Sequence, residues 1–373
     1  MKATVVVDAR MPDHSGIGTY VGNLMPRIAA LEPGWIFHVI IGADSNRGAD
    51  WARVPNVSVS RSSAGVYSVR EQVELVLRGR RDADLYWATH YNFPLALTKP
   101  LVVTVHDVAH LRLPEYTRSF AKRGYARTML RAGRRRAGAL MFDSEFTRRE
   151  FTAIVGEPPA RSEVVPLGVA PEWFQEKRGE RPVASDYFVY VGNIKPHKNV
   201  PVLLEAFRRL GDTVNARLIL IGQGDNLRTA DAAVEGALAR LGDRITVLGA
   251  VDFVTLRRYV QHAIGLVMPS LYEGFGLPPL EAMAAGCPTI VSRAGSLPEV
   301  CGDAAATFDP ADPEELAQRM RAMATDSGMR QDFIRRGRDH VRRFDWDVSA
   351  RRTRDILTSV LQDAAAHRSK AHG

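Results

Sequence analysis

The sequence predicts an α/β protein built from two doubly wound domains that face each other across a cleft. The chain has 373 residues, a length that suits two domains better than one. Short apolar runs alternate with amphipathic helical patterns, which is typical of parallel sheets covered by helices on both faces. A polar segment with Pro and Gly, residues 168–186, separates two halves that share this pattern. We therefore expect two Rossmann-like domains joined by a linker.

The elements of the first half follow from its apolar runs. Seven runs are predicted strands, at 4–9, 36–43, 56–60, 84–90, 101–107, 138–144 and 162–168. Helical patterns lie between them at 18–31, 67–80, 117–136 and 145–155. We expect this domain to cover residues 1–170.

The second half repeats the alternation. Its predicted strands are 186–192, 216–222, 244–249, 263–269, 288–292 and 305–308. Its predicted helices are 199–210, 226–241, 253–262, 278–285, 312–325 and 328–343. We expect this domain to cover residues 171–345, and a C-terminal helix at 346–373 to pack back towards the N-terminal domain.

Composition limits the class of protein. The two cysteines, Cys287 and Cys301, predict no disulfide framework and fit a reducing compartment. The first apolar run is too short for a signal peptide, because Asp8 follows it at once, and no run is long enough to span a bilayer. We expect a cytoplasmic protein.

The net charge of +8 is concentrated in the first half. Residues 1–170 contain 23 Lys and Arg against 16 Asp and Glu, whereas residues 171–373 contain 27 against 26. The segment 116–142 has eight basic residues and no acidic one, and four of its arginines recur every four residues: Arg123, Arg127, Arg131 and Arg135. This stripe is either a solvated helix face or a contact with anionic lipid headgroups or a phosphate-bearing acceptor.

The stretch "PSLYEGFGLPPLEAMAAGCP" (269–288) predicts an anion site. Its pattern predicts the end of a buried strand and then a glycine turn. A helix is predicted to start at Pro278 and Pro279 and to be capped by Gly286. The start of such a helix presents free N–H groups and the positive end of the helix dipole. We therefore expect an anionic ligand at this turn.

Three other positions are candidates for the site. Gly16 and Gly18 are predicted to precede a helix, but Val21 occupies the place of a third dinucleotide-binding glycine, so a plain tight turn is an equal interpretation. His106 ends a predicted strand and either donates to a substrate oxygen or caps that strand. Lys198 opens a predicted helix, where it opposes the helix dipole unless it neutralises a phosphate.

Taken together, these motifs resemble the retaining glycosyltransferases of family four, which have the two-domain GT-B fold. The resemblance covers nearly the whole chain, through "SGIGTY", "VHD", "DSEFTRREF", "VPLGV", "VGNIKPHKN", "LILIGQG" and above all "PSLYEGFGLPPLEAMAAGCPTIVSRAGSLPEV". The last segment is specific, whereas the isolated glycine motifs are not.

The resemblance implies a role for each candidate residue in a nucleotide-sugar site. Glu273 would hold hydroxyls of the donor sugar and Glu281 the ribose of the nucleotide. The backbone N–H groups of Phe275, Gly276 and Leu277 would bind the diphosphate.

The resemblance also implies roles outside that turn. Lys198 would add a positive charge at the diphosphate, His106 would contact the sugar, and Gly16 or Gly18 would close on the diphosphate or acceptor. The family commonly pairs this Lys with an Arg, but this chain has Asn193 and His197 nearby, which leaves the partner of the second phosphate charge open.

The resemblance further implies metal-independent transfer of a hexosyl group without a cofactor, by a front-face mechanism in which the leaving diphosphate helps to deprotonate the acceptor. The segments "VHDVAHLRLPEY" and "DARMPDHSGIGTYV" resemble the polysaccharide mannosyltransferase branch, which suggests GDP-mannose as donor; UDP-glucose, UDP-N-acetylglucosamine and dTDP-rhamnose stay open. The expected acceptor is a growing surface glycan or lipopolysaccharide, or an undecaprenyl-diphosphate-linked glycan, at the inner face of the membrane. The pair Asp345 and Asp347 in "FDWD" is interpreted as structural, not as a metal site.

Two alternatives belong to other classes. A nicotinamide-dependent oxidoreductase, with Asp44 on the ribose, would explain the glycine pair but not the two glutamates of the second half. A non-catalytic basic module for membrane or nucleic acid would explain the charge of the first half. Nucleic acid is not an expected partner, because the charge is confined to one segment and no aromatic stacking platform accompanies it.

Overall fold

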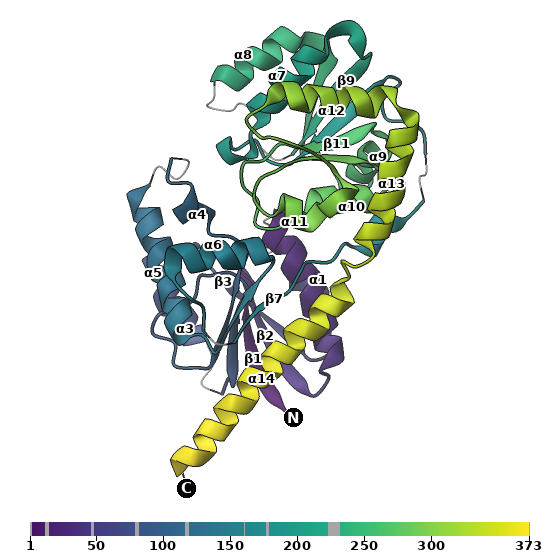
Figure 1. Ribbon diagram of the computed structural model, residues 1–373. Coiled ribbons are helices and arrows are strands. Elements are labelled where there is room, and N and C mark those ends of the chain that lie inside the picture. The colour runs from purple at the N-terminus through teal and green to yellow at the C-terminus, as the bar shows by residue number, and fades with distance from the viewer. Residues whose placement is uncertain are drawn as a thin grey trace. The chain divides into compact units, whose positions relative to one another are not determined.

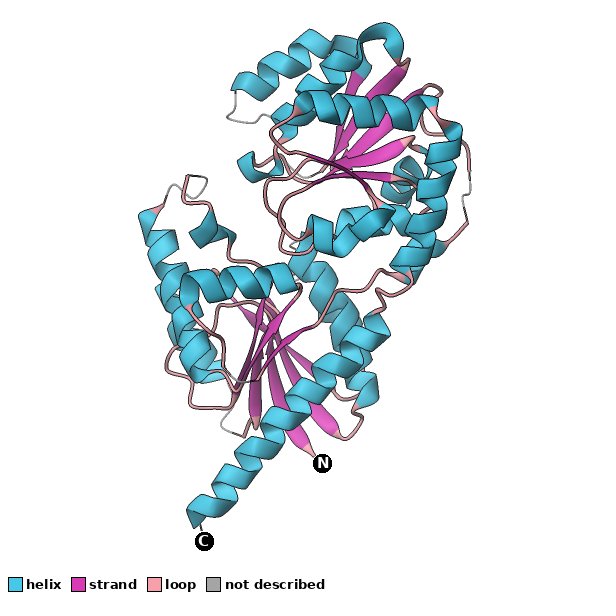
Figure 2. Cartoon of the chain, viewed as in Figure 1, coloured by secondary structure: helices cyan, strands magenta, loops and turns pink. Residues whose placement is uncertain are grey.

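The chain folds into two compact units (Figure 1). A computed structural model describes residues 2–11, 15–45, 48–78, 82–115, 119–159, 161–176, 179–222 and 232–372. The first unit comprises Met1–Gly168 and Asp345–Gly373, and the second comprises Val169–Phe344. Each unit contains one all-parallel sheet with helices on both faces (Figure 2). The predicted α/β fold with two doubly wound units is confirmed.

The first unit has a seven-stranded sheet in the order β3-β2-β1-β4-β5-β6-β7. Its strands are β1 Ala3–Asp8, β2 Trp35–Gly42, β3 Val57–Ser62, β4 Leu85–Ala88, β5 Leu101–Val105, β6 Ala139–Phe142 and β7 Ser162–Val164. Its helices are α1 Ser15–Leu31, α2 Gly48–Trp51, α3 Val69–Arg78, α4 Ala109–Arg112, α5 Phe120–Arg136, α6 Glu145–Val155 and α14 Trp346–His372.

Alternate residues of these strands enter two separate apolar layers. One layer joins Tyr86, Val103 and Phe142 of the sheet to α3, α5 and α6 through buried side chains such as Leu75 and Leu130. The other face carries α1 and α14. The inner strands β4 and β6 are therefore unbroken apolar runs, because both of their faces are buried.

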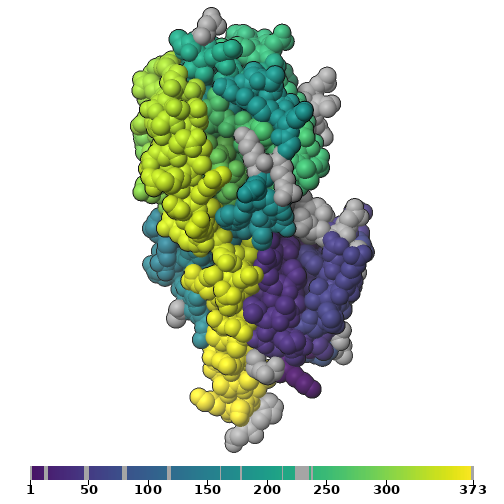
Figure 3. All heavy atoms as spheres, turned by 90° about the vertical axis from the view of Figure 1, so that its right-hand side faces the viewer, coloured from purple at the N-terminus to yellow at the C-terminus, as the bar shows by residue number. Residues whose placement is uncertain are grey.

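The long C-terminal helix α14 belongs to the first unit, where it lies along α1 (Figure 3). Its buried residue Val360 lies so close to Gly138 that a Cβ there would be only 2.9 Å from Val360 Cγ1, closer than van der Waals contact. Arg27 pairs with Asp347 at 2.8 Å, and Asp345 accepts a hydrogen bond from the Asp347 N–H at 2.6 Å. Both aspartates of "FDWD" thus act at the start of this helix.

The second unit has a six-stranded sheet in the order β10-β9-β8-β11-β12-β13. Its strands are β8 Asp186–Val191, β9 Ala216–Ile221, β10 Ile245–Gly249, β11 Gly265–Met268, β12 Thr289–Ser292 and β13 Ala306–Phe308. Its α-helices are α7 Val200–Leu210, α8 Ala232–Leu241, α9 Phe253–His262, α10 Leu277–Ala284, α11 Leu297–Cys301, α12 Pro313–Thr325 and α13 Ser327–Val341. Its short 3₁₀ helices include η1 Pro171–Phe174 and η2 Pro196–Lys198.

The order of the strands fixes where a ligand can bind. In the second sheet the chain moves outward in one direction from β8 to β10 and then returns to pair β11 with the other side of β8. Ligands of doubly wound sheets bind outside the carboxyl ends of the strands at such a switch point. The loops after β8 and β11 therefore meet at the expected position of a site.

Several details differ from the sequence prediction, which did not include the short helices α2, α4 and α11. Gly16 and Gly18 lie in the first turn of α1, which begins at Ser15, so the prediction that they precede the helix is wrong. The start of the predicted helix 226–241 lies outside the described residues, and α8 begins at Ala232.

Candidate active site

The turn after β11 takes the shape that an anion site requires. Gly276 is the N-cap of α10 and has φ +102°, which an L side chain rarely adopts. A Cβ at this position would lie 2.7 Å from the Cδ2 atom of Leu297. Pro278 and Pro279 occupy the first helical turn, where a missing N–H costs little, and Gly286 has φ +76° immediately after the C-cap residue Ala285.

Three backbone N–H groups are available at this turn. Within the part of the chain that the structure describes, the N–H groups of Phe275, Gly276 and Leu277 donate no hydrogen bond. They lie at the N-terminal end of α10, where the helix dipole favours negative charge. This is the donor arrangement that binds phosphate groups in proteins.

The loop after β8 brings a lysine to the same turn. The Lys198 Nζ atom lies 2.7 Å and 2.9 Å from the two carboxylate oxygens of Glu273. Both side chains are largely buried, with 20% and 12% of their surface exposed. The Leu271 N–H donates to the His197 carbonyl at 2.8 Å, so the two loops are also joined through their backbones. The sequence assigned Lys198 and Glu273 separate roles, and the structure makes them a direct ion pair.

The position of Lys198 depends on an unusual backbone. Asn199, between η2 and α7, has φ +54°, and its side-chain amide donates to the Pro310 carbonyl at 2.9 Å. Lys198 therefore ends η2 and lies two residues before the first residue of α7. Asn193 lies half-buried in the same loop, and its carbonyl accepts a hydrogen bond from the Tyr190 hydroxyl at 2.9 Å.

A third segment, after β12, supports Glu273 and was missed by the sequence analysis. The Ser296 N–H donates to the Glu273 carbonyl at 3.1 Å, and the Ser296 hydroxyl donates to the Phe275 carbonyl at 2.7 Å. Gly295, with φ +63°, packs so closely that a Cβ would lie 2.6 Å from the Glu273 nitrogen. The Ser270 hydroxyl donates to Glu273 Oε1 at 2.6 Å. The only sequence signal was the phrase "SRAGSLPEV", in which no single residue stood out.

Glu281 has a different environment from Glu273. It lies on α10, two turns further along, and is partly exposed. Burial raises the pKa of its carboxyl to about 7, although a hydrogen bond with Trp173 of η1 acts in the opposite direction. The Glu281 carboxyl is therefore partly protonated near neutral pH, whereas Glu273, eight residues earlier, forms an ion pair with Lys198.

His106 lies in the first unit, directly after β5. Its Nδ1 atom is 2.7 Å from Asp143 Oδ2, and its Nε2 atom is 2.8 Å from the Thr89 carbonyl. Burial alone would lower the pKa of this imidazole, but the Asp143 charge and the two hydrogen bonds raise it overall. Because both partners are acceptors, the ring donates from both nitrogens and is held as an imidazolium. A contact with a sugar oxygen would have to replace one of these hydrogen bonds.

Gly16 and Gly18 lie near the start of α1 in the same unit. Gly16 is exposed, with open space around the position of a Cβ, and Gly18 is buried. Tyr20, one turn further along, places its ring against His106 with centroids 4.8 Å apart. The start of α1 and His106 therefore share the carboxyl edge of the first sheet.

A buried ionic network at the end of β1 was also missed. Arg10 donates to Asp8 at 2.8 Å and to Glu71 of α3 at 2.9 Å, and all three side chains are buried. Glu71 also accepts hydrogen bonds from Asn92 and from the Tyr125 hydroxyl of α5. The network ties α3 and α5 to the carboxyl edge of the sheet, where its burial makes each charge depend on its partners.

No group of three or more His, Cys, Asp or Glu residues among the described residues could hold a metal ion. In the same residues, no helix has the length and apolarity needed to cross a membrane.

Comparison with known proteins gives concordant matches for both halves. Residues 14–173 match the family model described as Glycosyltransferase Family 4, and residues 171–340 match Glycosyl transferases group 1. The chain is 30% identical over 274 residues to an O-antigen chain mannosyltransferase B of Escherichia coli, covering 70% of this chain and 71% of that protein. It is 28% identical over 263 residues to the O-antigen chain mannosyltransferase RfbU of Salmonella typhimurium, covering 70% of each.

A solved structure shows the same fold. The sucrose-phosphate synthase of Thermosynechococcus elongatus superposes with a TM-score of 0.81 at 20% identity, covering 97% of this chain and all of that one.

Proposed function

The chain belongs to the family 4 glycosyltransferases and is a hexosyltransferase with the GT-B fold, and we propose that it transfers mannose from GDP-mannose to a surface polysaccharide. The mannosyltransferases among its relatives support the choice of sugar. Family membership speaks against the two alternatives, an oxidoreductase and a non-catalytic basic module.

One observation supports the proposed donor site most directly. Among the described residues, the Lys198–Glu273 pair lies beside three backbone N–H groups that donate no hydrogen bond, those of Phe275, Gly276 and Leu277. The N–H groups of Phe275, Gly276 and Leu277 bind the diphosphate, and Lys198 supplies a full positive charge. Glu273, released from Lys198 as the phosphates arrive, accepts hydrogen bonds from hydroxyls of the sugar. Glu281 accepts hydrogen bonds from the ribose.

The proposed transfer retains the configuration of the sugar. Breaking the bond between the sugar and the diphosphate leaves negative charge on the phosphate oxygens, which the N–H groups and Lys198 stabilise. The acceptor hydroxyl attacks the same face of the sugar and gives its proton to the departing diphosphate. The protein contributes orientation and charge stabilisation and forms no covalent bond to the sugar. The paired His106 ring fits a role in holding the sugar-facing end of β5.

The second negative charge of the diphosphate is met by the start of α10 in this proposal. Where the family has an Arg near this Lys, this chain has Asn193 and His197, and the Asn193 carbonyl accepts a hydrogen bond from Tyr190. Three N–H donors and the helix dipole supply partial positive charge without a second cation.

The nucleotide and sugar are tested by a panel of donors. We expect GDP-mannose to give the largest increase in Tm and the fastest turnover among nucleotide sugars, since only the correct donor fills the base, ribose and sugar subsites together. Stabilisation by a nicotinamide cofactor and by no nucleotide sugar would contradict the proposal.

Metal is not required in the proposed mechanism. We expect transfer to continue in excess chelator at a rate close to that without chelator, because Lys198 and the start of α10 supply the charge that a divalent ion supplies elsewhere. A complete loss of transfer that Mg²⁺ or Mn²⁺ restores would contradict this mechanism.

Glu281 makes donor binding sensitive to pH. The ionised carboxylate accepts hydrogen bonds from ribose hydroxyls, whereas the protonated form accepts them weakly. Because the pKa in the free protein is about 7, we expect GDP affinity to rise several-fold from pH 6 to pH 8. Titration calorimetry on wild type and Glu281→Gln measures this. The rise should be smaller in the variant, and identical pH profiles would contradict the role of Glu281.

The same group affects stability with the opposite trend. An acid with a raised pKa binds more protons in the folded than in the unfolded state between pH 4.5 and about 7. Its contribution to the free energy of unfolding therefore falls as pH rises through that window, and Glu281→Gln should remove this fall. Unfolding in urea at pH 5 and pH 7.5 provides a check that does not depend on activity.

The proposed acceptor is a glycan on an undecaprenyl-diphosphate carrier, presented at the inner face of the membrane. The arginines of α5 support this, because Arg127, Arg131 and Arg135 are exposed in the structure, whereas Arg123, the fourth arginine of the stripe, is half-buried and donates to the Pro114 carbonyl. Each basic residue near an anionic surface contributes about 1 kcal/mol. Residues 116–118 of the basic segment lie outside the described residues.

A further inference from the structure

The outer side of α3 carries a row of apolar side chains that face solvent. Val69, Val73 and Leu77 recur every four residues and are 85%, 61% and 79% exposed. On the opposite side of the helix Glu71 and Leu75 are fully buried. A surface helix normally presents polar residues outward, so a row that runs the length of a ten-residue helix needs an explanation.

The row continues towards α5 through Leu95. This residue is 41% exposed, its N–H donates to the Gln72 side chain of α3 at 2.8 Å, and its carbonyl accepts a hydrogen bond from Arg136 of α5. Gln72 also donates to the Tyr125 hydroxyl of α5 at 3.4 Å. The helices α3 and α5 are therefore neighbours, with Leu95 bridging them (Figure 1).

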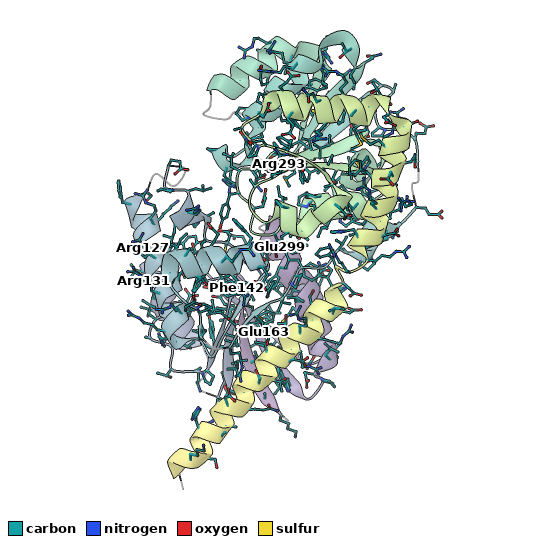
Figure 4. All side chains as sticks on the ribbon, viewed as in Figure 1. Arg127, Arg131, Phe142, Glu163, Arg293 and Glu299 are labelled. Atoms are coloured by element: carbon teal, nitrogen blue, oxygen red, sulfur yellow. The ribbon has the colours of Figure 1, made fainter. Side chains whose placement is uncertain are left out.

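The outer side of α5 is basic. Arg127, Arg131 and Arg135 are exposed, and Figure 4 shows the first two on the outer side of this helix. Among the described residues no carboxylate pairs with these three arginines, whereas Arg112 and Arg148 nearby pair with Glu150 and Glu145. The α5 sequence contains no acidic residue.

An apolar row beside unpaired arginines has the chemistry of a membrane interface. Aliphatic side chains enter the boundary between headgroups and acyl chains, and arginines bind lipid phosphates in two-point contacts. We propose that α3 lies in the surface of an anionic bilayer, with Val69, Val73, Leu77 and Leu95 inserted between lipids and the α5 arginines on the headgroups. This inference rests on the proposed membrane-bound acceptor and adds a hydrophobic contact to the electrostatic one.

Insertion differs from attraction by charge alone in its response to salt. Charge attraction is screened as salt rises, whereas burial of aliphatic surface is not weakened. We therefore expect wild type to remain partly bound to vesicles of phosphatidylcholine and phosphatidylglycerol at 0.5 M NaCl, where the Debye length is below about 10 Å and surface charge attraction is strongly screened. Complete release at this salt concentration would overturn insertion.

The test uses the full chain and vesicle sedimentation. Val73→Asp/Leu77→Asp should reduce partitioning by roughly tenfold or more, because charged groups now meet the acyl boundary. Val254→Asp is the matched control, since Val254 is 63% exposed on α9 of the other unit. Arg127→Gln/Arg131→Gln/Arg135→Gln should reduce binding to anionic vesicles mainly at low salt. Equal binding by the α3 variant and wild type would overturn the proposal.

A direct probe does not depend on loss of binding. Leu77→Trp should show a blue-shifted emission with vesicles and quenching by brominated acyl chains. Emission unchanged by vesicles would overturn insertion. If wild type is a dimer in ultracentrifugation, and Val73→Asp/Leu77→Asp is a monomer that binds vesicles as wild type does, the row is a subunit contact and the proposal is wrong.

The outcome for the donor site is separate. All these variants should transfer sugar to a short soluble acceptor at the wild-type rate, because none touches the Lys198–Glu273 site. Normal transfer without vesicle binding would overturn the membrane inference alone, whereas absence of transfer in wild type with every donor would count against the proposed function.

Discussion

Lys198→Ala should lower kcat/KM for sugar transfer by about a hundred- to a thousandfold, the usual effect of removing one preorganised group that stabilises transition-state charge. Lys198 is the cation held 2.7 Å from Glu273, beside the start of α10. Its loss removes the positive charge that faces the departing diphosphate. Steady-state kinetics with the preferred donor measures the effect.

The matched control is Lys195→Ala. Lys195 is exposed and lies in the same loop, three residues earlier, so the substitution removes the same charge from the same segment. We expect its kinetics to stay within about twofold of wild type, as is usual for exposed sites. Equal losses in both variants would mean that the net charge of the loop matters and not the position of Lys198. Thermal unfolding of Lys198→Ala separates loss of fold from loss of catalysis, because the variant leaves Glu273 without its cation.

Gly295→Ala should damage both stability and activity. The φ of +63° costs an L residue about 1–2 kcal/mol, and a Cβ 2.6 Å from the Glu273 nitrogen forces backbone to move at a further cost of about 1–3 kcal/mol. The displaced atoms belong to Glu273 itself. Since a shift of about 1 Å at a reacting group costs on the order of a hundredfold in rate, turnover should fall by about that factor.

Gly211→Ala separates the conformational cost of a positive φ from the cost of the steric clash. Gly211 has φ +53° in the same unit, but nothing lies within 4 Å of the position of its Cβ. It should lose only the conformational cost of its backbone, with φ +53° and ψ −144°, of about 1–3 kcal/mol, and keep full activity. Equal losses of stability in the two alanine variants, measured by urea unfolding, would contradict the close packing of Gly295 on Glu273.

The fold could be predicted from the sequence because both sheets are covered by helices on both faces. Each of the predicted strands is present, from β1 at Ala3–Asp8 to β13 at Ala306–Phe308, and the fully buried ones, such as β6 and β11, have the unbroken apolar run typical of such strands. The turn at Gly276 could also be predicted, because a glycine followed shortly by two prolines is a local signal for the start of a helix.

The contacts within the site could not be predicted from the sequence, because they depend on the order of the strands in the sheet. Lys198 and Glu273 are 75 residues apart in the sequence and meet only because β8 pairs with β11. His106 likewise contacts Asp143 only because β5 pairs with β6. The support of Glu273 by Gly295 and Ser296, and the network of Asp8, Arg10 and Glu71, likewise join loops and helices that no local pattern connects.

In the proposed donor site Glu281 binds the nucleotide and Glu273 orients the sugar. The most direct test is titration calorimetry of the free nucleoside diphosphate, which lacks the sugar, against Glu273→Ala and Glu281→Ala. Glu281→Ala should weaken binding by about ten- to a hundredfold, the loss of a charged acceptor worth about 1.5–3 kcal/mol. Glu273→Ala should bind the diphosphate as tightly as wild type or more tightly, since Lys198 is freed, and equal weakening in both variants would contradict the account.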